Sequence, residues 1–319
     1  MQQPNANEKA GKRNRSVRKL YRRARIPKES RDLDYILSNK GQLTERQATL
    51  LNLLAERGYM TIDHILHLMP ELADNKNSTL SATRLINKLV KYYLVDRASY
   101  QYVTQWDGTE KRTTVIALGE IGSQAVSFYR HRTRIRYENG KPILSRKAHH
   151  ILQVNHMEIV FREVIAEMGF ELVKDDKGKD VWLCECGNRV IGPDADLNPD
   201  AYTAIRDSKT GKIYHLLFEY DTGEEDRNYK NHFPTLTATF DKYVALKKSD
   251  EWYEKPAVQI VENPFPLFFF VTEEKKRFPK VRYLLNERGL DFAACLRHEF
   301  ADELRMVLSK LRSGEHVTG

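Results

Sequence analysis

The sequence predicts an α/β protein (α+β overall) of two domains, in which a small helical domain ending in a β-hairpin precedes a larger domain built on a mixed sheet. Three observations support this class. The chain has 319 residues, of which 41% are apolar, and this is enough for two cores. Apolar residues recur with helical spacing between residues 44 and 91. From residue 148 onward, short apolar runs alternate with helical patterns, as in a sheet covered by helices.

The positive charge of the chain is concentrated at its N-terminus. Residues 1–32 hold eleven Lys and Arg against three acids, a balance of +8 that equals the formal net charge of the whole chain. The low apolar content predicts that residues 1–36 form an arm that is disordered when free. Such an arm suits DNA because each neutralised phosphate releases counterions. A solubilising tail is the alternative. The arginines expected to contact DNA are Arg13, Arg15, Arg22 and Arg23.

Residues 37–128 are expected to form the first domain, which begins with a helix. Thr44 and Gln47 have the spacing of a capping box, so the helix starts there, and Gly58 ends it. Thr61 begins a shorter second helix that ends at Pro70. A third helix is predicted at about 78–91, and strands are predicted at 92–103 and 113–119.

Three short helices followed by a hairpin are typical of a winged helix-turn-helix. In that fold the third helix enters the major groove of DNA and the hairpin flanks it. Polar residues on the outer face of the third helix can donate to phosphates and base edges. These residues are Ser81, Arg84, Asn87, Lys88 and Lys91. A domain that contacts proteins is the alternative, but the basic arm directly upstream favours DNA.

A polar, weakly periodic segment at 129–147 is expected to link this domain to a second one at 148–319. The second domain begins with a helix that ends at Gly169 and carries Glu158 on an apolar stripe. A carboxylate in that position is costly unless it is paired or bound to a metal. Strands are predicted at 170–174, 181–184, 189–191, 200–205, 213–221 and 266–272. Helices are predicted at about 227–248, 273–289 and 291–312.

Acidic residues follow the most apolar predicted strand, in "HLLFEYDTGEE" (215–225). Side chains alternate along a strand, so Glu219 and Asp221 point the same way. Asp200 begins a neighbouring strand, and if the two strands pair as a hairpin, these carboxylates meet at one end of the sheet. Converging carboxylates repel one another unless a cation lies between them, and carboxylate and water oxygens suit Mg²⁺ or Mn²⁺. Such an ion could ionise a water and stabilise charge on a scissile phosphate.

The order of these motifs resembles a known family. Pro199-Asp200, followed by Glu219-Tyr220-Asp221, resembles the PD-(D/E)XK pattern of restriction-endonuclease-like folds. More specifically, the chain resembles the replication-relaxation family of bacterial mobile elements. The resemblance rests on a winged helix, a helix beginning "HHILQVN", a "PDA" strand start and the strand end "EYDTGEE", over about 40–290. Some members are similar to relaxases, which nick one strand at a transfer origin, and others act around plasmid replication.

The resemblance implies roles for the acids. It gives Asp221 the position where the endonuclease pattern has Lys, which would polarise the attacking water. Lys230, early in the next helix, is the expected substitute. Without such a substitute, Asp221 is an additional ligand or the centre is inactive. The metal-binding acids implied are Asp200 and Glu219, with Asp221 and Glu224 as further motif acids.

Two residues of the preceding helix are also expected at this site. Glu158 would be the helix carboxylate of the family pattern. His149 shares a helical face with His156 and lies near the acids in the predicted fold, so we expect it to take part as well.

Other patterns exclude classes of protein. "CECGN" (184–188) could be half of a zinc site, but a second cysteine pair is missing and Gly-Asn indicates a hairpin turn. The three cysteines of the chain fit a reducing compartment. No phosphate-binding GxxxxGK[ST] loop occurs, so no nucleotide cofactor is expected. No run of eighteen apolar residues occurs, which predicts a cytoplasmic bacterial protein without membrane insertion.

These expectations combine into a DNA-binding protein of a plasmid or integrative element. The favoured function is a metal-dependent, origin-specific nicking enzyme, relaxase-like, in conjugative mobilisation. Its expected partners are double-stranded origin DNA, relaxosome or coupling proteins, and a second copy of the chain in a homodimer. The alternatives are a non-catalytic replication initiator or relaxosome accessory protein, or a transcriptional regulator, and the missing motif lysine favours them.

Overall fold

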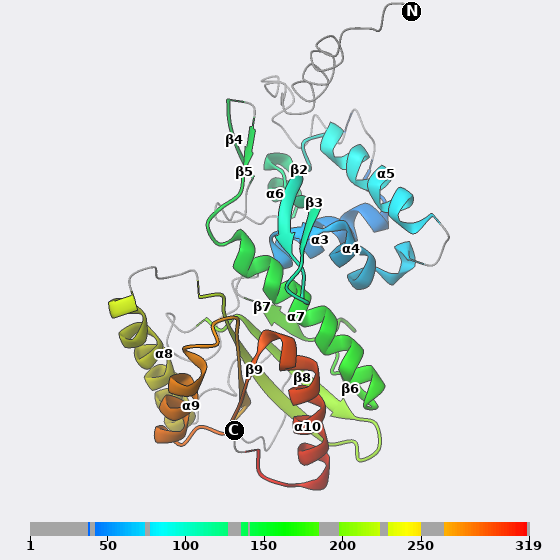
Figure 1. Cartoon of the computed structure of the whole chain (residues 1–319). Coiled ribbons are helices and arrows are strands. Elements are labelled where there is room, and N and C mark those ends of the chain that lie inside the picture. Colours follow the sequence, from blue (N-terminus) through cyan, green and yellow to red (C-terminus); the bar gives the residue numbers. More distant parts are fainter. Residues whose placement is uncertain are drawn as a thin grey trace, which may run out of the picture. The chain divides into compact units, whose positions relative to one another are not determined.

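The chain forms two structural units (Figure 1). The computed structural model describes residues 38, 42–73, 77–126, 135–139, 141–184, 198–223, 229–249 and 265–317, with the side chains at 100, 229–235 and 249 excepted. The first unit comprises residues up to 101 together with 112–148, and the second comprises 102–111 together with 149–319. In the part of the chain that the structure describes, no helix is both long enough and apolar enough to cross a membrane.

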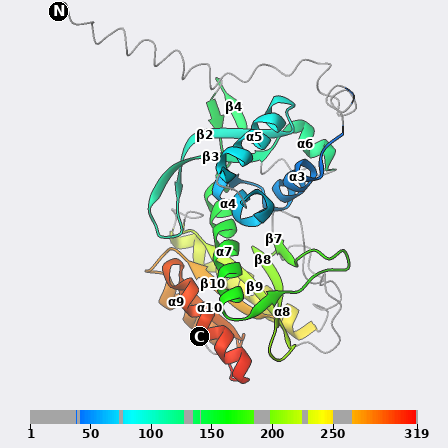
Figure 2. The ribbon, with the colours of Figure 1, turned by 90° about the vertical axis from the view of Figure 1, so that its right-hand side faces the viewer.

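The first unit combines short helices with a small antiparallel sheet (Figure 2). The sheet has the strand order β1-β3-β2, with Met60 of β1 opposite Ile116 of β3. A strand therefore lies between the first two helices, and the third helix precedes the hairpin as predicted. The elements are α3 (Glu45–Arg57), β1 (Met60–Thr61), α4 (Ile62–Leu68), a 3-10 turn (Pro70–Leu72), α5 (Ser78–Lys91), β2 (Val95–Thr104), β3 (Glu110–Leu118) and α6 (Glu120–Ala125).

Local hydrogen bonds explain where these helices begin. The N–H of Thr44 donates to the side-chain oxygen of Gln47 at 3.2 Å, and the helix ends at Gly58, whose φ is 69°. The hydroxyl of Thr61 accepts from the N–H of His64 at 3.2 Å, and the Nδ1 of His64 accepts from the N–H of Thr61 at 3.3 Å. Both predicted helix starts are confirmed, and His64 is a buried capping residue.

The segment expected to be a linker holds a second small hairpin. β4 (Arg136–Glu138) and β5 (Lys141–Ile143) pair in antiparallel fashion. The hydroxyl of Tyr137 donates to the backbone oxygen of Arg97 in β2 at 3.1 Å. This contact holds part of the predicted linker against the first unit. Weak periodicity in a polar segment gave no sign of these three-residue strands.

The second unit is built on a mixed sheet, as the sequence predicts. Its strand order is β11-β10-β9-β8-β6, with β7 also paired to β8. Strands β11, β10 and β9 are parallel, whereas β8 is antiparallel to β9, β6 and β7. The elements are α7 (Ala148–Glu167), β6 (Phe170–Leu172), β7 (Trp182–Cys184), β8 (Ala201–Asp207), β9 (Ile213–Asp221), α8 (Tyr229–Ser249), β10 (Leu267–Thr272), α9 (Phe278–Glu287), β11 (Phe292–Leu296), a 3-10 turn (Arg297–Glu299) and α10 (Phe300–Ser313).

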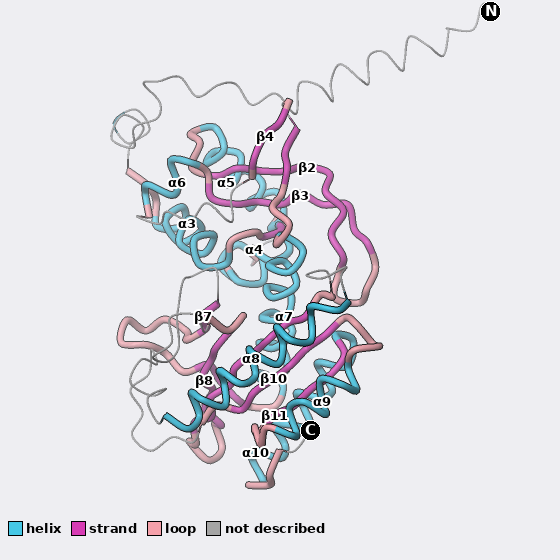
Figure 3. Tube along the Cα trace, turned by 90° about the vertical axis from the view of Figure 1, so that its left-hand side faces the viewer, coloured by secondary structure: helices cyan, strands magenta, loops and turns pink. Residues whose placement is uncertain are grey.

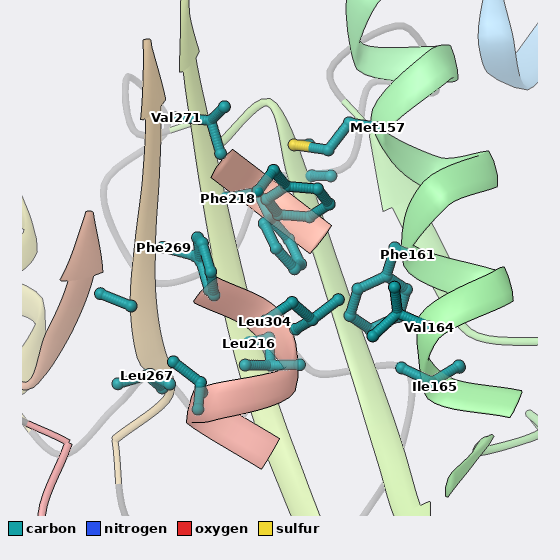
Figure 4. Close-up of a cluster of buried hydrophobic side chains, with 14 of the residues drawn as sticks. Met157, Phe161, Val164, Ile165, Leu216, Phe218, Leu267, Phe269, Val271 and Leu304 are labelled. Carbon is teal, nitrogen blue, oxygen red and sulfur yellow. The ribbon is translucent and has the colours of Figure 1, made fainter. Parts of the chain in front are cut away.

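Helices cover both faces of this sheet. Helices α7 and α10 pack on one face, where Phe161 and Leu304 contact Phe218 and its neighbours in a buried cluster (Figure 4). Helices α8 and α9 pack on the other face (Figure 3), where Phe240 and Leu285 share a cluster with Leu217 and its neighbours. Because side chains alternate along β9, its continuous apolar run supplies both cores.

One predicted helix is wrong. The segment 291–312 was expected to be helical throughout, but Phe292–Leu296 forms β11, a strand buried along its whole length and parallel to β10. A five-residue apolar run carries no periodicity that separates a strand from a buried helix turn, so pairing with β10 decides its structure. The predicted helix at 273–289 begins only at Phe278, and the predicted strand at 189–191 lies outside the described residues.

The tip of the β2–β3 hairpin belongs to the second unit. The ring of Trp106 lies 6.1 Å from that of Tyr220 and 5.6 Å from that of Phe300. The side-chain amide of Gln153 donates to the backbone oxygen of Thr104 at 2.7 Å. The expected domain 37–128 therefore differs from the structure at residues 102–111, because an aromatic side chain there packs against the core of the second unit. In the predicted winged helix this tip would lie beside the DNA, whereas here its Trp106 packs within the second unit.

Candidate acidic site

The pairing of β8 with β9 brings two predicted site acids to one end of the sheet. The strands are antiparallel, and Ala201 lies opposite Phe218. Asp200 directly precedes β8, and its carboxylate accepts from the backbone N–H of Tyr220, the residue after Glu219. The hairpin expected from the sequence is confirmed. The negative charges of both Glu219 and Asp200 act on the hydroxyl of Tyr243, so these acids are close neighbours.

Two hydrogen bonds hold the carboxylate of Asp200, which is 7% exposed. Its Oδ2 accepts from the backbone N–H of Tyr220 at 2.6 Å, and its Oδ1 lies 2.8 Å from the Nε2 of His150 in α7. A carboxylate has about four lone-pair positions. Asp200 is therefore fixed in orientation and still has capacity to bind a cation.

Glu219 is held from the opposite side of the sheet, by α8. The hydroxyl of Tyr243 donates to the Oε1 of Glu219 in a short hydrogen bond. Complete burial raises the pKa of Tyr243 well above its ordinary value, and the negative charges of Glu219 and then Asp200 raise it further. Tyr243 therefore remains protonated and keeps donating to the carboxylate.

Asp221 has a different environment from Asp200 and Glu219. Its Oδ1 accepts from the N–H of Gly223 at 2.9 Å, and its Oδ2 accepts from the hydroxyl of Thr272 in β10 at 3.1 Å. The Nη1 of Arg277 lies 3.6 Å from the Oδ1, and both side chains of this ion pair are almost fully buried. The position where the endonuclease pattern has Lys therefore holds an acid whose charge is balanced by an arginine from the segment before α9.

His149 lies in a cluster adjoining these acids. Its Nε2 is 3.2 Å from the Oε1 of Glu273, which also accepts from the hydroxyl of Tyr220 at 2.9 Å. The Nη1 of Arg297 lies 3.2 Å from the Oε2 of Glu273. Burial raises the pKa of Glu273, but the hydrogen bond with His149 and the charge of Arg297 outweigh it, so the net pKa is lowered. The histidine that contacts Asp200 is therefore His150, the residue after the predicted His149.

Glu158 is fully buried in α7, and an arginine balances its charge. Its Oε1 accepts from Arg162 at 3.0 Å from Nε and 2.9 Å from Nη2. Arg162 also donates to Asp180 at 2.7 Å. A bidentate contact one helical turn away accounts for a carboxylate on an apolar stripe without requiring a metal.

The predicted DNA-contacting face of α5 points outward. Arg84, Asn87, Lys88 and Lys91 are exposed, and Ser81 is half-buried. The side-chain oxygen of Asn87 accepts a short hydrogen bond from Arg97 of β2. Sequence reasoning missed Arg97, because its place beside α5 depends on how the hairpin folds back. Glu224, Arg13, Arg15, Arg22 and Arg23 lie outside the described residues, as does the side chain of Lys230.

The arrangement fits a divalent ion bound by two carboxylates. Within the described ranges, no group of three or more His, Cys, Asp or Glu side chains could hold a metal. The neighbouring pair Asp200 and Glu219 remains. Mg²⁺ commonly keeps several waters and is bound through one or two carboxylates plus the phosphates of its substrate. This donor set suits such an ion, with Asp221 as an ion-paired neighbour.

Several residues at this site carry no sequence signal of their role. Tyr243 occurs in a helix of mixed polarity, and Glu273 and Arg277 lie more than fifty positions beyond Glu219 in the sequence. They reach the site because β10 runs parallel to β9 with Thr272 opposite Asp221.

Comparison with known proteins adds a family match. A family model described as replication-relaxation matches residues 51–259 of the chain. No curated protein matches the chain. Among solved structures, the chain is similar to the restriction endonuclease FokI, with a TM-score of 0.25 and 10% identity, over 84% of this chain and 45% of that one. The chain thus spans less than half the length of that protein's chain.

Proposed function

The chain belongs to the replication-relaxation family, and from this premise we propose that it nicks one strand of DNA at an origin of a plasmid or integrative element. The observation that carries the proposal is the hydrogen bond from the backbone N–H of Tyr220 to Asp200, which holds this acid at the end of β9 beside Glu219. Origin DNA is the proposed partner, together with relaxosome or coupling proteins.

The hydrogen bonds around the two acids support a catalytic role. The backbone N–H of Tyr220 and the ring of His150 fix Asp200, and the hydroxyl of Tyr243 fixes Glu219. Carboxylates held in this way are preorganised ligands. Asp200 and Glu219 would hold Mg²⁺ or Mn²⁺, which supplies an activated water and charge stabilisation at the scissile phosphate.

The surface of α5 supports DNA binding. Arg84, Lys88 and Lys91 are exposed on one helix, and Arg97 from β2 holds Asn87 beside them. Arginine and asparagine are the side chains that most often read guanine and adenine in the major groove. We assign sequence reading to this face and general phosphate contacts to the basic arm.

The test is a pair of charge-removing variants, Asp200→Asn and Glu219→Gln. Each should weaken Mn²⁺ binding about 100-fold by calorimetry, because a ligand is lost while the shape is kept. Nicking of supercoiled plasmid that carries the cognate origin should be abolished, with DNA affinity unchanged. The matched control is Glu171→Gln, an exposed acid on β6 of the same sheet.

Two results would count against the proposal. Equal Mn²⁺ affinity in wild type and both variants would exclude these acids as ligands. A wild-type protein that never nicks its own origin with Mg²⁺ or Mn²⁺, with or without partner proteins, would exclude the enzyme.

The Asp221–Arg277 ion pair favours a second candidate function. A lysine at this position would polarise the attacking water, whereas an acid paired with a buried arginine does not. The second candidate is therefore a replication initiator or relaxosome accessory protein that binds origin DNA without cutting it. Specific origin binding without nicking under every metal condition would select this candidate.

A further inference from the structure

We infer that the tip of the β2–β3 hairpin, residues 102–111, positions the acidic site and that Trp106 is the residue through which it acts. This inference rests on the proposed function for its catalytic consequence. Its structural part, the support of the end of β9, stands on the contacts within the second unit.

The tip is attached to the second unit by both apolar and polar contacts. The partly buried ring of Trp106 packs edge-on against Phe300 at 5.6 Å and at a tilt against Tyr220 at 6.1 Å. The backbone oxygen of Thr104 accepts from the amide of Gln153 in α7 at 2.7 Å. Aromatic pairs at these separations are worth more than their buried area alone.

The turn of the hairpin fits closely against Arg297. Gly108 has a φ of +86°, and a Cβ placed there would lie 3.1 Å from the Nη2 of Arg297. The carboxylate of Asp107 accepts from the N–H of Thr109 at 2.9 Å and from its hydroxyl at 2.7 Å, which closes the turn. Arg297 is in turn paired with Glu273.

The contacts of Trp106 and of the turn beside Arg297 both lead to Tyr220. Its ring contacts Trp106, and its hydroxyl donates to Glu273, the partner of Arg297. Its backbone N–H donates to Asp200 at 2.6 Å.

Tyr220 stands between Glu219 and Asp221 in the strand, so a shift of its backbone moves both acids. The hairpin tip therefore fixes the end of β9 from the face opposite to that of Glu219. Trp106 acts through Tyr220 and is therefore a positioning residue.

The test compares Trp106→Ala, Trp106→Phe and a matched control, Tyr102→Ala. Tyr102 is an aromatic residue of the same tip that is 70% exposed. Hydrogen exchange of peptides covering 213–223 and 267–272 is measured in each protein. Nicking at saturating DNA and Mn²⁺, DNA affinity and thermal unfolding are measured alongside.

Trp106→Ala should raise exchange in 213–223 about tenfold while leaving 267–272 near its wild-type rate, because the Tyr220 N–H loses its support. The nicking rate should fall about tenfold with DNA affinity within about twofold. Trp106→Phe should bring both the exchange rate in 213–223 and the nicking rate close to wild type. Tyr102→Ala should match wild type in both. Gln153→Leu removes only the hydrogen bond to Thr104, so it should raise exchange in 213–223 by less than Trp106→Ala does. It replaces Trp106→Ala in the test if that variant does not fold.

The outcomes separate this inference from the proposed function. Exchange in 213–223 that stays at the wild-type rate in Trp106→Ala and Gln153→Leu overturns the positioning role. Exchange that rises equally in 213–223 and 267–272 overturns it too, because it reports general destabilisation. If wild type does not nick, the proposed function fails, and the exchange measurement still decides the role of Trp106.

Discussion

Asp221 and Arg277 form an ion pair in which both side chains are nearly excluded from water. Removing charges from water is costly, so each partner depends on the other. The family pattern drew attention to Asp221 as an additional ligand or a relic. The contacts instead describe it as the counter-charge of the buried guanidinium of Arg277.

A double-mutant cycle tests this pairing. Asp221→Asn and Arg277→Met should each lower the free energy of unfolding by about 2–4 kcal/mol, because each leaves a buried partner without its counter-charge. The double variant should lose less than the sum, with a coupling of about 1–3 kcal/mol in urea denaturation. The more exposed pair Arg288–Asp241 is the matched control, with an expected coupling below about 1 kcal/mol. Additive losses at Asp221 and Arg277 would show that the two side chains do not act as a pair.

At the scale of elements, the end of α10 makes a buried ion pair with the sheet through Arg312. Arg312 contacts both carboxylate oxygens of Asp207 at the end of β8, at 2.9 and 3.1 Å. It also donates to the backbone oxygen of Met168 at 2.7 Å and lies 4.5 Å above the ring of Phe170. A planar, bidentate contact of this kind cannot be reproduced by lysine.

Arg312→Ala should lower the free energy of unfolding by about 3 kcal/mol, because it leaves the buried carboxylate of Asp207 without its partner. The control lies on the same helix: Arg305 pairs with Glu167 and Asp302 at the surface, and Arg305→Ala should change the free energy of unfolding far less than Arg312→Ala does. Both are measured by denaturant unfolding. Similar losses in the two variants would mean that Arg312 is an ordinary surface cation.

Elements with strong local signals were predictable from the sequence. The capping residues Thr44 and Thr61 predicted two helix starts, and the apolar runs at 200–205 and 213–221 predicted the two strands that pair as β8 and β9. β11 was not predictable, because a short apolar run becomes a strand only beside β10.

The partners of the site were harder to predict than its acids. His149 and His150 are adjacent, and only the packing of α7 decides that the second contacts Asp200 and the first Glu273. Glu273 and Arg277 depend on the parallel register of β10 with β9, which no local pattern encodes. Trp106 is an apolar residue near a turn, and its role follows from the assembly of the second unit.

For the molecule as a whole, the excess positive charge lies in residues 1–32. Deleting residues 1–36 should weaken binding to all duplexes alike and reduce the slope of log affinity against log salt by about 0.9 for each phosphate that the arm neutralises. Arg84→Ala is the contrasting variant: it should cost about 1–3 kcal/mol of discrimination between cognate and random DNA, with a slope change of at most about 1. Fluorescence anisotropy at several salt concentrations measures both. An unchanged slope after the deletion would remove the arm from the interface.

The assignment of residues 102–111 to the second unit bears on how such a protein can change over evolution. The two units are interleaved along the chain, so no single point of recombination before Asp200 exchanges the whole first unit without also dividing the contacts of Trp106. A replacement unit would have to bring its own hairpin with an apolar side chain at the same place. Exposed residues such as Arg84 are therefore free to vary one at a time, while residues of the hairpin tip are constrained by their contacts with Tyr220 and Phe300.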